Sequence, residues 1–144
     1  MMNKAGSRAL LAGAIFSAVA ALLHVGCLVF GAPWYRFLGA GERMARMAER
    51  GHWYPAAVTT AIICILSVWA LYASSGAGLI RPLPFLRVVL FAIGAVYLLR
   101  GLGAAVLVPY FPGNSLDFWL VTSAVCTVAG ALHLIGLKEI SSKR

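Results

Sequence analysis

One arginine stands inside an apolar run of this sequence. Arg100 lies in the stretch AVYLLRGLGAAVLVP, residues 95–109, which otherwise has the composition of a membrane span. A charged side chain in the hydrocarbon region costs about 3 kcal/mol or more unless it is paired, hydrated or able to reach the headgroups. Arg100 therefore either extends its long side chain to the membrane surface or faces inward and holds a polar partner.

A histidine in another run stands at the same depth. His24 follows Ala9 by 15 residues, and Arg100 follows Pro84 by 16 residues. At a rise of 1.5 Å per residue, each lies about 22 to 24 Å from the start of its run. This equal depth predicts that the two side chains share one level of the membrane.

An inward-facing Arg100 needs an anion. Glu42, Glu49 and Asp117 are three of the four acidic residues, and all lie on the side of the membrane nearer Arg100. We predict an ion pair with Asp117, which begins the next run after a short connection, or else with Glu42, because carboxylates accept bidentate hydrogen bonds from arginine. The predicted cavity would hold an anion, a lipid headgroup or a proton. Its candidate ligand-binding residues are Arg100, His24, Tyr97, Thr60 or the adjacent Thr59, Asp117, Glu42 and His52.

The other polar groups do not form a reaction centre. His133 lies about 15 Å along the helix axis from the level of His24, so the two cannot bind one haem from opposite faces. The cysteines, Cys27, Cys64 and Cys126, stand alone, without the spacing of a zinc or dithiol site. There is also no nucleophile with an adjacent base and no phosphate-binding loop. We predict no cofactor and no metal, and the sequence indicates no enzyme class.

The composition predicts a membrane protein. Of 144 residues, 62% are hydrophobic and 11% are charged, which is too apolar for one small soluble domain. The twelve Lys and Arg residues stand singly at the ends of apolar runs, not in a patch with interleaved aromatics. We therefore predict membrane lipids as partners and no nucleic acid, although the net charge is +8.

Four apolar runs approach or exceed the roughly 20 residues that cross the hydrocarbon core. They cover residues 9–31, 55–75, 84–108 and 116–137. The connection between the first two has charged residues and methionines at helical spacing, flanked by Trp and Tyr, as in an interfacial helix. The predicted fold is all-α, an integral-membrane four-helix bundle with a short amphipathic helix between spans one and two, forming a single domain.

Each span carries a stripe of small or weakly polar residues, which lets membrane helices approach closely. We predict that the stripes face each other and that the larger apolar residues face lipid. The stripes are Gly13, Ser17, Ala21, His24 and Cys27; Ala56, Thr60, Cys64, Ser67 and Ser74; Gly94, Tyr97, Arg100 and Gly101; and Ser123, Cys126, Gly130 and His133.

The basic residues predict an orientation. Under the positive-inside rule they place both termini in the cytoplasm. The N-terminal run also has the basic start and apolar stretch of a signal peptide, but its continuation through HVGCLVFG favours a retained span. The two groups are Lys4, Arg8, Arg81, Arg87, Lys138, Lys143 and Arg144 on one side, and Arg36, Arg43, Arg46 and Arg50 on the other.

Three stretches, HVGCLVFGAPWYRFLGAGERMARMAERGHWYPA, SVWALYASSGAG and YLLRGL, resemble an uncharacterised group of small bacterial inner-membrane proteins with four spans. The long first connection followed by three closely linked spans is also similar to the layout of DoxX-like proteins. These resemblances imply a multi-pass protein of the bacterial inner membrane and no particular activity.

The residues are compatible with two functional classes. One is a protein that binds, and in some cases moves, an anionic or amphiphilic small molecule or lipid. The other is an accessory or assembly subunit of a larger membrane complex. Four helices leave little room for a transport path, so a transporter would have to form a homodimer.

Overall fold

The computed structural model describes residues 4–142, with side chains from residue 8 onward. Within that range the chain is all-helical, with seven α-helices, one 3-10 turn and no strand, which confirms the all-α prediction. The long helices are α1 (Lys4–Phe30), α4 (Trp53–Gly76), α5 (Leu86–Leu102) and α7 (Leu116–Ser141). The short elements are α2 (Ala32–Phe37), α3 (Glu42–Glu49), α6 (Ala104–Leu107) and η1 (Val108–Tyr110).

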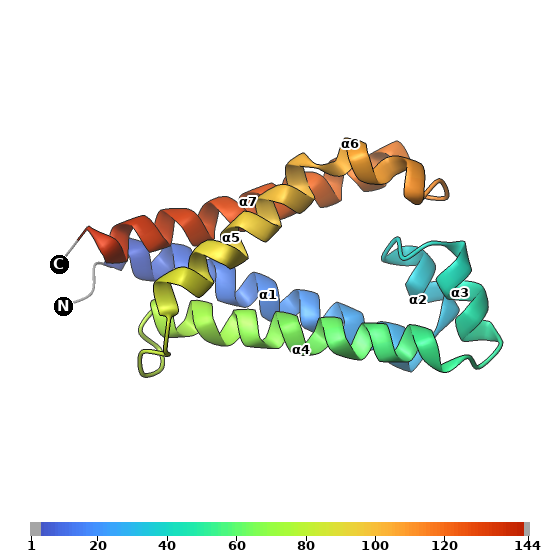
Figure 1. The fold of residues 1–144 in the computed structure, drawn as a ribbon, viewed down its shortest axis with the longest axis horizontal. Coiled ribbons are helices and arrows are strands. Elements are labelled where there is room, and N and C mark those ends of the chain that lie inside the picture. Colours follow the sequence, from blue (N-terminus) through green and yellow to red (C-terminus); the bar gives the residue numbers. More distant parts are fainter. Residues whose placement is uncertain (1–3, 143–144) are drawn as a thin grey trace.

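The long helices form two pairs. α1 packs along α4, α5 packs along α7, and α1 also contacts α7. Figure 1 shows both chain ends and the α4–α5 connection at one end of the molecule. α2, α3 and the connection into α7 lie at the other end, where the two pairs diverge (Figure 1).

Three helices are long and apolar enough to cross a membrane, namely α1 from Arg8 onward, α4 and α7. The third predicted span, residues 84–108, is bent: α5 meets the segment Ala104–Tyr110 at an angle of 63°. The number of candidate spans is four if this bent pair is one span. Gly103 lies at the bend, and a Cβ atom there would be 2.5 Å from the carbonyl oxygen of Leu99, so this backbone requires glycine.

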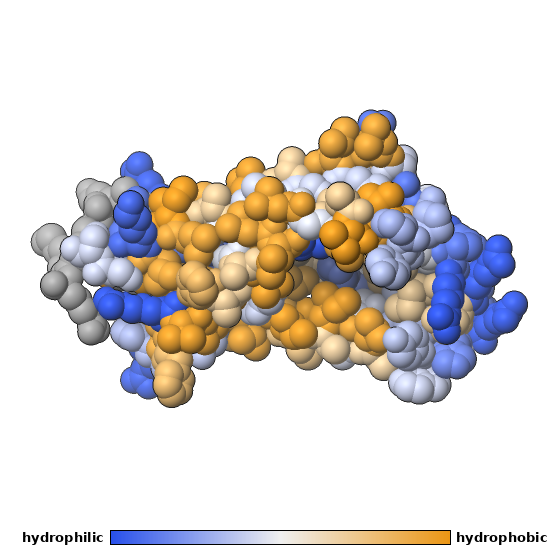
Figure 2. Space-filling model, turned by 45° about the horizontal axis from the view of Figure 1, so that its top comes forward, coloured by the Kyte–Doolittle hydropathy of each residue, from blue (hydrophilic) through white to orange (hydrophobic). Residues whose placement is uncertain are grey.

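The surface has the pattern of a protein that crosses a membrane. Figure 2 shows a broad apolar band between two hydrophilic ends. Large apolar side chains of the long helices are exposed, among them Leu22 in α1, Leu99 in α5 and Val121 in α7. Of the residues that predict the orientation, Lys143, Arg144 and the side chain of Lys4 lie outside the described part of the chain.

Glycines allow close packing between α7 and its two neighbours. A Cβ atom on Gly130 would lie 2.9 Å from the carbonyl oxygen of Gly94 on α5. A Cβ atom on Gly13 would lie 2.8 Å from Cε1 of His133. The stripes of the first, third and fourth predicted spans therefore face each other, as the sequence predicts.

The prediction for the second stripe is wrong. Thr60 and Cys64 are exposed on α4, and the exposed Ser67 lines a groove beside α1. The hydroxyl of Thr60 donates to the Ala56 carbonyl at 2.8 Å, and that of Ser67 donates to the Ile63 carbonyl at 2.7 Å. Because each hydroxyl is satisfied within its own helix, these residues can face lipid without an unpaired donor.

Ion pairs join α2 to α3. Nε and Nη2 of Arg36 each donate to a carboxylate oxygen of Glu42 at 2.9 Å, and Nη2 also donates to Glu49 at 2.8 Å. Arg46 donates to Glu42 at 3.2 Å. Hydrogen bonds from Arg36 lower the pKa of Glu42 to about 2. The hydrogen bonds to Glu42 and Glu49 in turn raise the pKa of Arg36.

We expect α3 to loosen in acid. Because the pKa of Glu42 is depressed from 4.5 to about 2 in the folded chain, its stabilising effect is present above pH 4.5 and is lost as the pH falls toward 2. Hydrogen exchange of the α3 amides, corrected for the intrinsic pH dependence of exchange, should accelerate over this interval. Glu42→Gln should remove the dependence, and amides in the middle of α4 should not show it. Equal protection of α3 at both ends of the interval would contradict this expectation.

Candidate ligand-binding cavity

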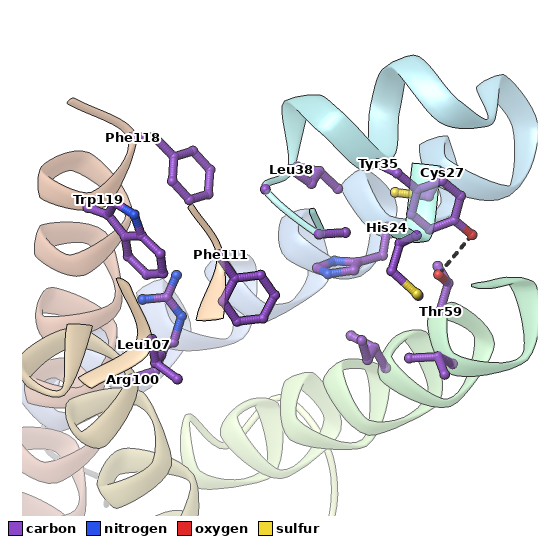
Figure 3. Close-up of a pocket in the computed structure, with 15 residues that line it drawn as sticks. His24, Cys27, Tyr35, Leu38, Thr59, Arg100, Leu107, Phe111, Phe118 and Trp119 are labelled. Carbon is purple, nitrogen blue, oxygen red and sulfur yellow. Dashed lines mark hydrogen bonds between the residues drawn. The ribbon is translucent and has the colours of Figure 1, made fainter. Parts of the chain in front are cut away.

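A cavity of about 320 Å³ lies where the two helix pairs diverge. Figure 3 shows its two walls, one carrying Arg100 and Trp119, the other carrying His24 and Tyr35. Phe111 lies between them. Most of the remaining lining is apolar. Ligand sites in proteins have volumes of roughly 300 to 1,000 Å³, so this cavity has the size of a small-molecule site.

Arg100 is the cation of the cavity. Its Cζ atom lies 5.2 Å from the centroid of the buried Trp119 ring, a cation–π contact that orients the guanidinium. Nη2 lies 3.5 Å from the hydroxyl oxygen of Thr122, at the limit of hydrogen bonding. Nη1 is buried and has no hydrogen-bond partner. Arg100 therefore has unused donors in a mostly apolar space.

The predicted ion pair of Arg100 is wrong. Among the described residues, no carboxylate lies within ion-pair distance of its guanidinium. Asp117 is exposed in the first turn of α7. Glu42 is bound to Arg36 and Arg46. Trp119, two residues beyond Asp117, occupies the place expected for the carboxylate.

The opposite wall carries His24. Its Nδ1 lies 2.7 Å from the carbonyl oxygen of Ala20. A carbonyl oxygen only accepts, so in the neutral ring Nδ1 carries the proton and Nε2 has a free lone pair. Nε2 is thus the ring nitrogen left for a ligand.

A pair of hydroxyl groups lies on the same wall. Thr59 donates to the carbonyl oxygen of Pro55 at 2.7 Å. Its oxygen lies 3.0 Å from the hydroxyl of Tyr35. Since the proton of Thr59 is already used, Tyr35 is the donor in this second bond. Both hydroxyl protons are therefore satisfied within the protein.

Of the predicted site residues, the structure brings Arg100 and His24 to the same cavity. Tyr97 does not line it. Its ring packs in the core of the bundle against His133, and its hydroxyl bonds the hydroxyl of Ser17 at 2.7 Å. His133 is a fully buried histidine whose Nδ1 donates to the Ala129 carbonyl.

The other predicted site residues lie outside the cavity. Thr60 faces outward, and its neighbour Thr59 takes the inward position. Glu42 and His52 line a separate hollow beside α3. His52 also accepts a hydrogen bond from the backbone of Tyr54 and so caps the start of α4.

The sequence analysis did not identify the aromatic residues of the cavity. Tyr35, Phe111, Phe118 and Trp119 all line it. The stretch LDFWL directly follows the connection after the Arg100 run. A Trp so close in sequence to the end of that run is a signal for a cation–π partner, because arginine stacks on aromatic faces.

Two contacts link the two walls of the cavity at the end of the molecule that carries α2 and α3. The side-chain amide of Asn114 donates to the carbonyl oxygen of Gly39 at 3.0 Å. The ring of Phe118 lies directly against Gly39, where no Cβ atom would fit. Gly39 also has a φ of 74°, which favours glycine. These contacts join the connection before α7 to the connection between α2 and α3.

We expect Asn114→Ala to open this end. Loss of one hydrogen bond of about 1 kcal/mol should raise the open population about fivefold. The buried thiol of Cys27 lines the cavity. In a background with alanine in place of Cys64 and Cys126, the reactivity of this thiol reports the opening. Its reaction with a maleimide should be about five times faster in the variant. Gly113→Ala, next to Asn114 and in open space, is the matched control, and equal rates in both variants would contradict the assignment.

Comparison of the chain with models of known protein families, with curated proteins and with solved structures finds no match. The fold and the site define the class of the protein by themselves. It is an all-helical protein with three or four candidate membrane spans and a cavity between two diverging helix pairs.

Proposed function

We propose that this is a four-span membrane protein that binds an anionic amphiphile in the cavity between its helix pairs. The ligand has one oxyanion, a carboxylate or a phosphate, joined to an apolar body. The observation that carries the proposal is the buried Nη1 of Arg100, which has no partner in a mostly apolar space. A guanidinium has a planar set of donors that matches an oxyanion, and the apolar lining matches the rest of the ligand.

In this proposal the bent pair of α5 and the segment Ala104–Tyr110 counts as one span. Both termini are cytoplasmic in a bacterial inner membrane, and the cavity opens in the outer half. The described basic residues at the two ends are evenly divided, because Arg8, Arg81, Arg87 and Lys138 lie toward one end and the four arginines of α2, α3 and the following turn lie at the other. The excess that supports this orientation comes from Lys4, Lys143 and Arg144 of the sequence.

Dodecanoate is a suitable probe. We expect it to bind the protein in phosphatidylcholine nanodiscs, above its partitioning into empty nanodiscs, in a calorimetric titration. Dodecyltrimethylammonium has the same chain and the opposite charge and should show no such excess. Arg100→Gln should weaken dodecanoate binding at least tenfold, because hydrogen bonds to charged groups contribute about 1.5 to 3 kcal/mol. Arg87→Gln is the matched control, an exposed arginine of the same helix, and should bind like the parent.

The same oxyanion chemistry is found in free acids and in lipid headgroups. Phosphatidylglycerol added to the nanodiscs should displace dodecanoate if the natural ligand is a lipid, and should leave its affinity unchanged if the ligand is a free acid. Equal binding of the two probes, with no effect of Arg100→Gln, would contradict the proposal. That result would favour the alternative class, an accessory or assembly subunit of a larger membrane complex.

A further inference from the structure

We infer that the ligand also carries a hydroxyl group, which donates a hydrogen bond to His24. This inference rests on the proposed function and adds a second recognition element to the same site. The two polar walls of the cavity have opposite hydrogen-bonding character. Arg100 has donors only, whereas the wall that carries His24 offers acceptors (Figure 3).

Nearly all polar hydrogens on the wall that carries His24 are already used in hydrogen bonds within the protein. The Nδ1 proton of His24 is used by Ala20, and the hydroxyl protons of Thr59 and Tyr35 are used within the protein. What remains for a ligand is the lone pair of His24 Nε2, together with those of the Tyr35 oxygen. The thiol of Cys27 is the one further polar group on this wall, and a thiol is a weak donor.

An acceptor wall selects among chemical groups. With the His24 ring neutral, a second oxyanion would face lone pairs and would receive no strong hydrogen bond there. An ammonium group would lack a counter-charge, because Glu42 and Glu49 are exposed, outside the cavity lining, and bound to Arg36. A neutral donor satisfies Nε2 without adding charge to a mostly apolar space. The ligand class is therefore a hydroxylated amphiphilic acid, or an anionic lipid whose headgroup carries a hydroxyl.

Single-chain probes test the hydroxyl directly. Two hydroxydodecanoates are compared with dodecanoate, one with its hydroxyl next to the carboxylate and one with its hydroxyl at the far end of the chain. We expect one of them to bind the parent protein about five- to tenfold tighter than dodecanoate, because it makes one added hydrogen bond. The matching methoxy compound, which cannot donate, should bind no tighter than dodecanoate. This comparison changes only the ligand, so it does not depend on the folding of any variant.

A protein variant assigns the acceptor. His24→Phe keeps a ring but removes Nε2, and the ratio of hydroxydodecanoate to dodecanoate affinity, measured in this variant, should fall to about one. Competition in nanodiscs distinguishes a lipid ligand from a free acid. If the ligand is a lipid, phosphatidylglycerol should compete with dodecanoate more strongly than phosphatidylethanol, which lacks the hydroxyl. Equal competition by these two lipids, together with a preference for a hydroxydodecanoate, would indicate a free hydroxy acid.

The outcomes separate this inference from the proposed function. If dodecanoate binds in an Arg100-dependent manner but no hydroxyl compound binds tighter, or the methoxy compound binds equally well, the inference is wrong and the proposed function stands. A hydroxyl preference that survives in His24→Phe would also overturn it. If no anionic probe binds, the proposed function itself fails.

Discussion

Gly101→Leu should produce the largest loss of stability of any single change in the bundle. A Cβ atom on Gly101 would lie 2.8 Å from both the carbonyl oxygen of Ser123 and the amide nitrogen of Thr127, and still closer to the Thr127 hydroxyl. That hydroxyl cannot move freely, because it donates to Ser123 at 2.7 Å. Leucine must therefore push α5 away from α7. We expect a loss of about 3 kcal/mol or more, against a gain in helix propensity of at most about 1 kcal/mol.

Unfolding in mixed micelles with increasing denaturing detergent measures this loss. Gly113→Ala is the control, since a Cβ atom there meets nothing within 4 Å, and it should change stability by less than about 0.5 kcal/mol. If Gly101→Leu unfolds at the same detergent fraction as the parent, α5 and α7 do not pack as described.

Arg100→Met should make the protein more stable and, at the same time, unable to bind an anion. An unpaired arginine in a membrane costs about 3 kcal/mol at the bilayer centre, and Arg100 has no carboxylate partner in the described chain. The variant loses a cation–π contact with Trp119 worth about 0.5 to 2 kcal/mol. The difference leaves a net gain of about 1 to 2.5 kcal/mol in the same unfolding assay. A residue kept at a cost to stability is typical of a functional site.

The control for this prediction is Asp117→Asn. Since Asp117 is exposed and has no ion pair in the described chain, the change should cost no more than the roughly 0.3 to 1 kcal/mol that an acidic residue contributes in the first turn of a helix. The ion pair expected from the sequence gives the opposite pattern: Arg100→Leu and Asp117→Asn would both destabilise, and the double variant would recover part of the loss. A clear loss of stability in Arg100→Met would therefore show that Arg100 has a partner.

The positions of Arg100 and His24 could be predicted because both lie within long regular helices. Depth follows from the number of residues and a constant rise, and the cavity contains both side chains. The partner of Glu42 could not be predicted in this way. Glu42 belongs to a short helix that follows a turn, and its ion pair with Arg36 depends on how α2 and α3 pack.

The buried face of α4 was harder to predict than the depth of Arg100 and His24 along their helices. Thr59 and Thr60 are adjacent, and one residue turns the side chain by about 100° around a helix. Small residues occur on several faces of this helix, so their spacing did not identify the buried one. In the structure that face carries Pro55, Thr59, Leu66 and Ala73. The large apolar residues gave no further guidance, because lipid and protein interior favour the same side chains.

The bend at Gly103 has a consequence for the surrounding bilayer. α5 has 17 residues, about 26 Å of helix, whereas α7 has 26 residues, about 39 Å. The hydrocarbon core is about 30 Å thick, so in the proposed four-span protein α5 alone would be shorter than the core, and the segment Ala104–Tyr110 would have to complete its span. Local thinning of the bilayer beside α5 would reduce this mismatch. Such thinning would bring the headgroup layer closer to the level of Arg100 and would favour residence in thinner regions of a membrane.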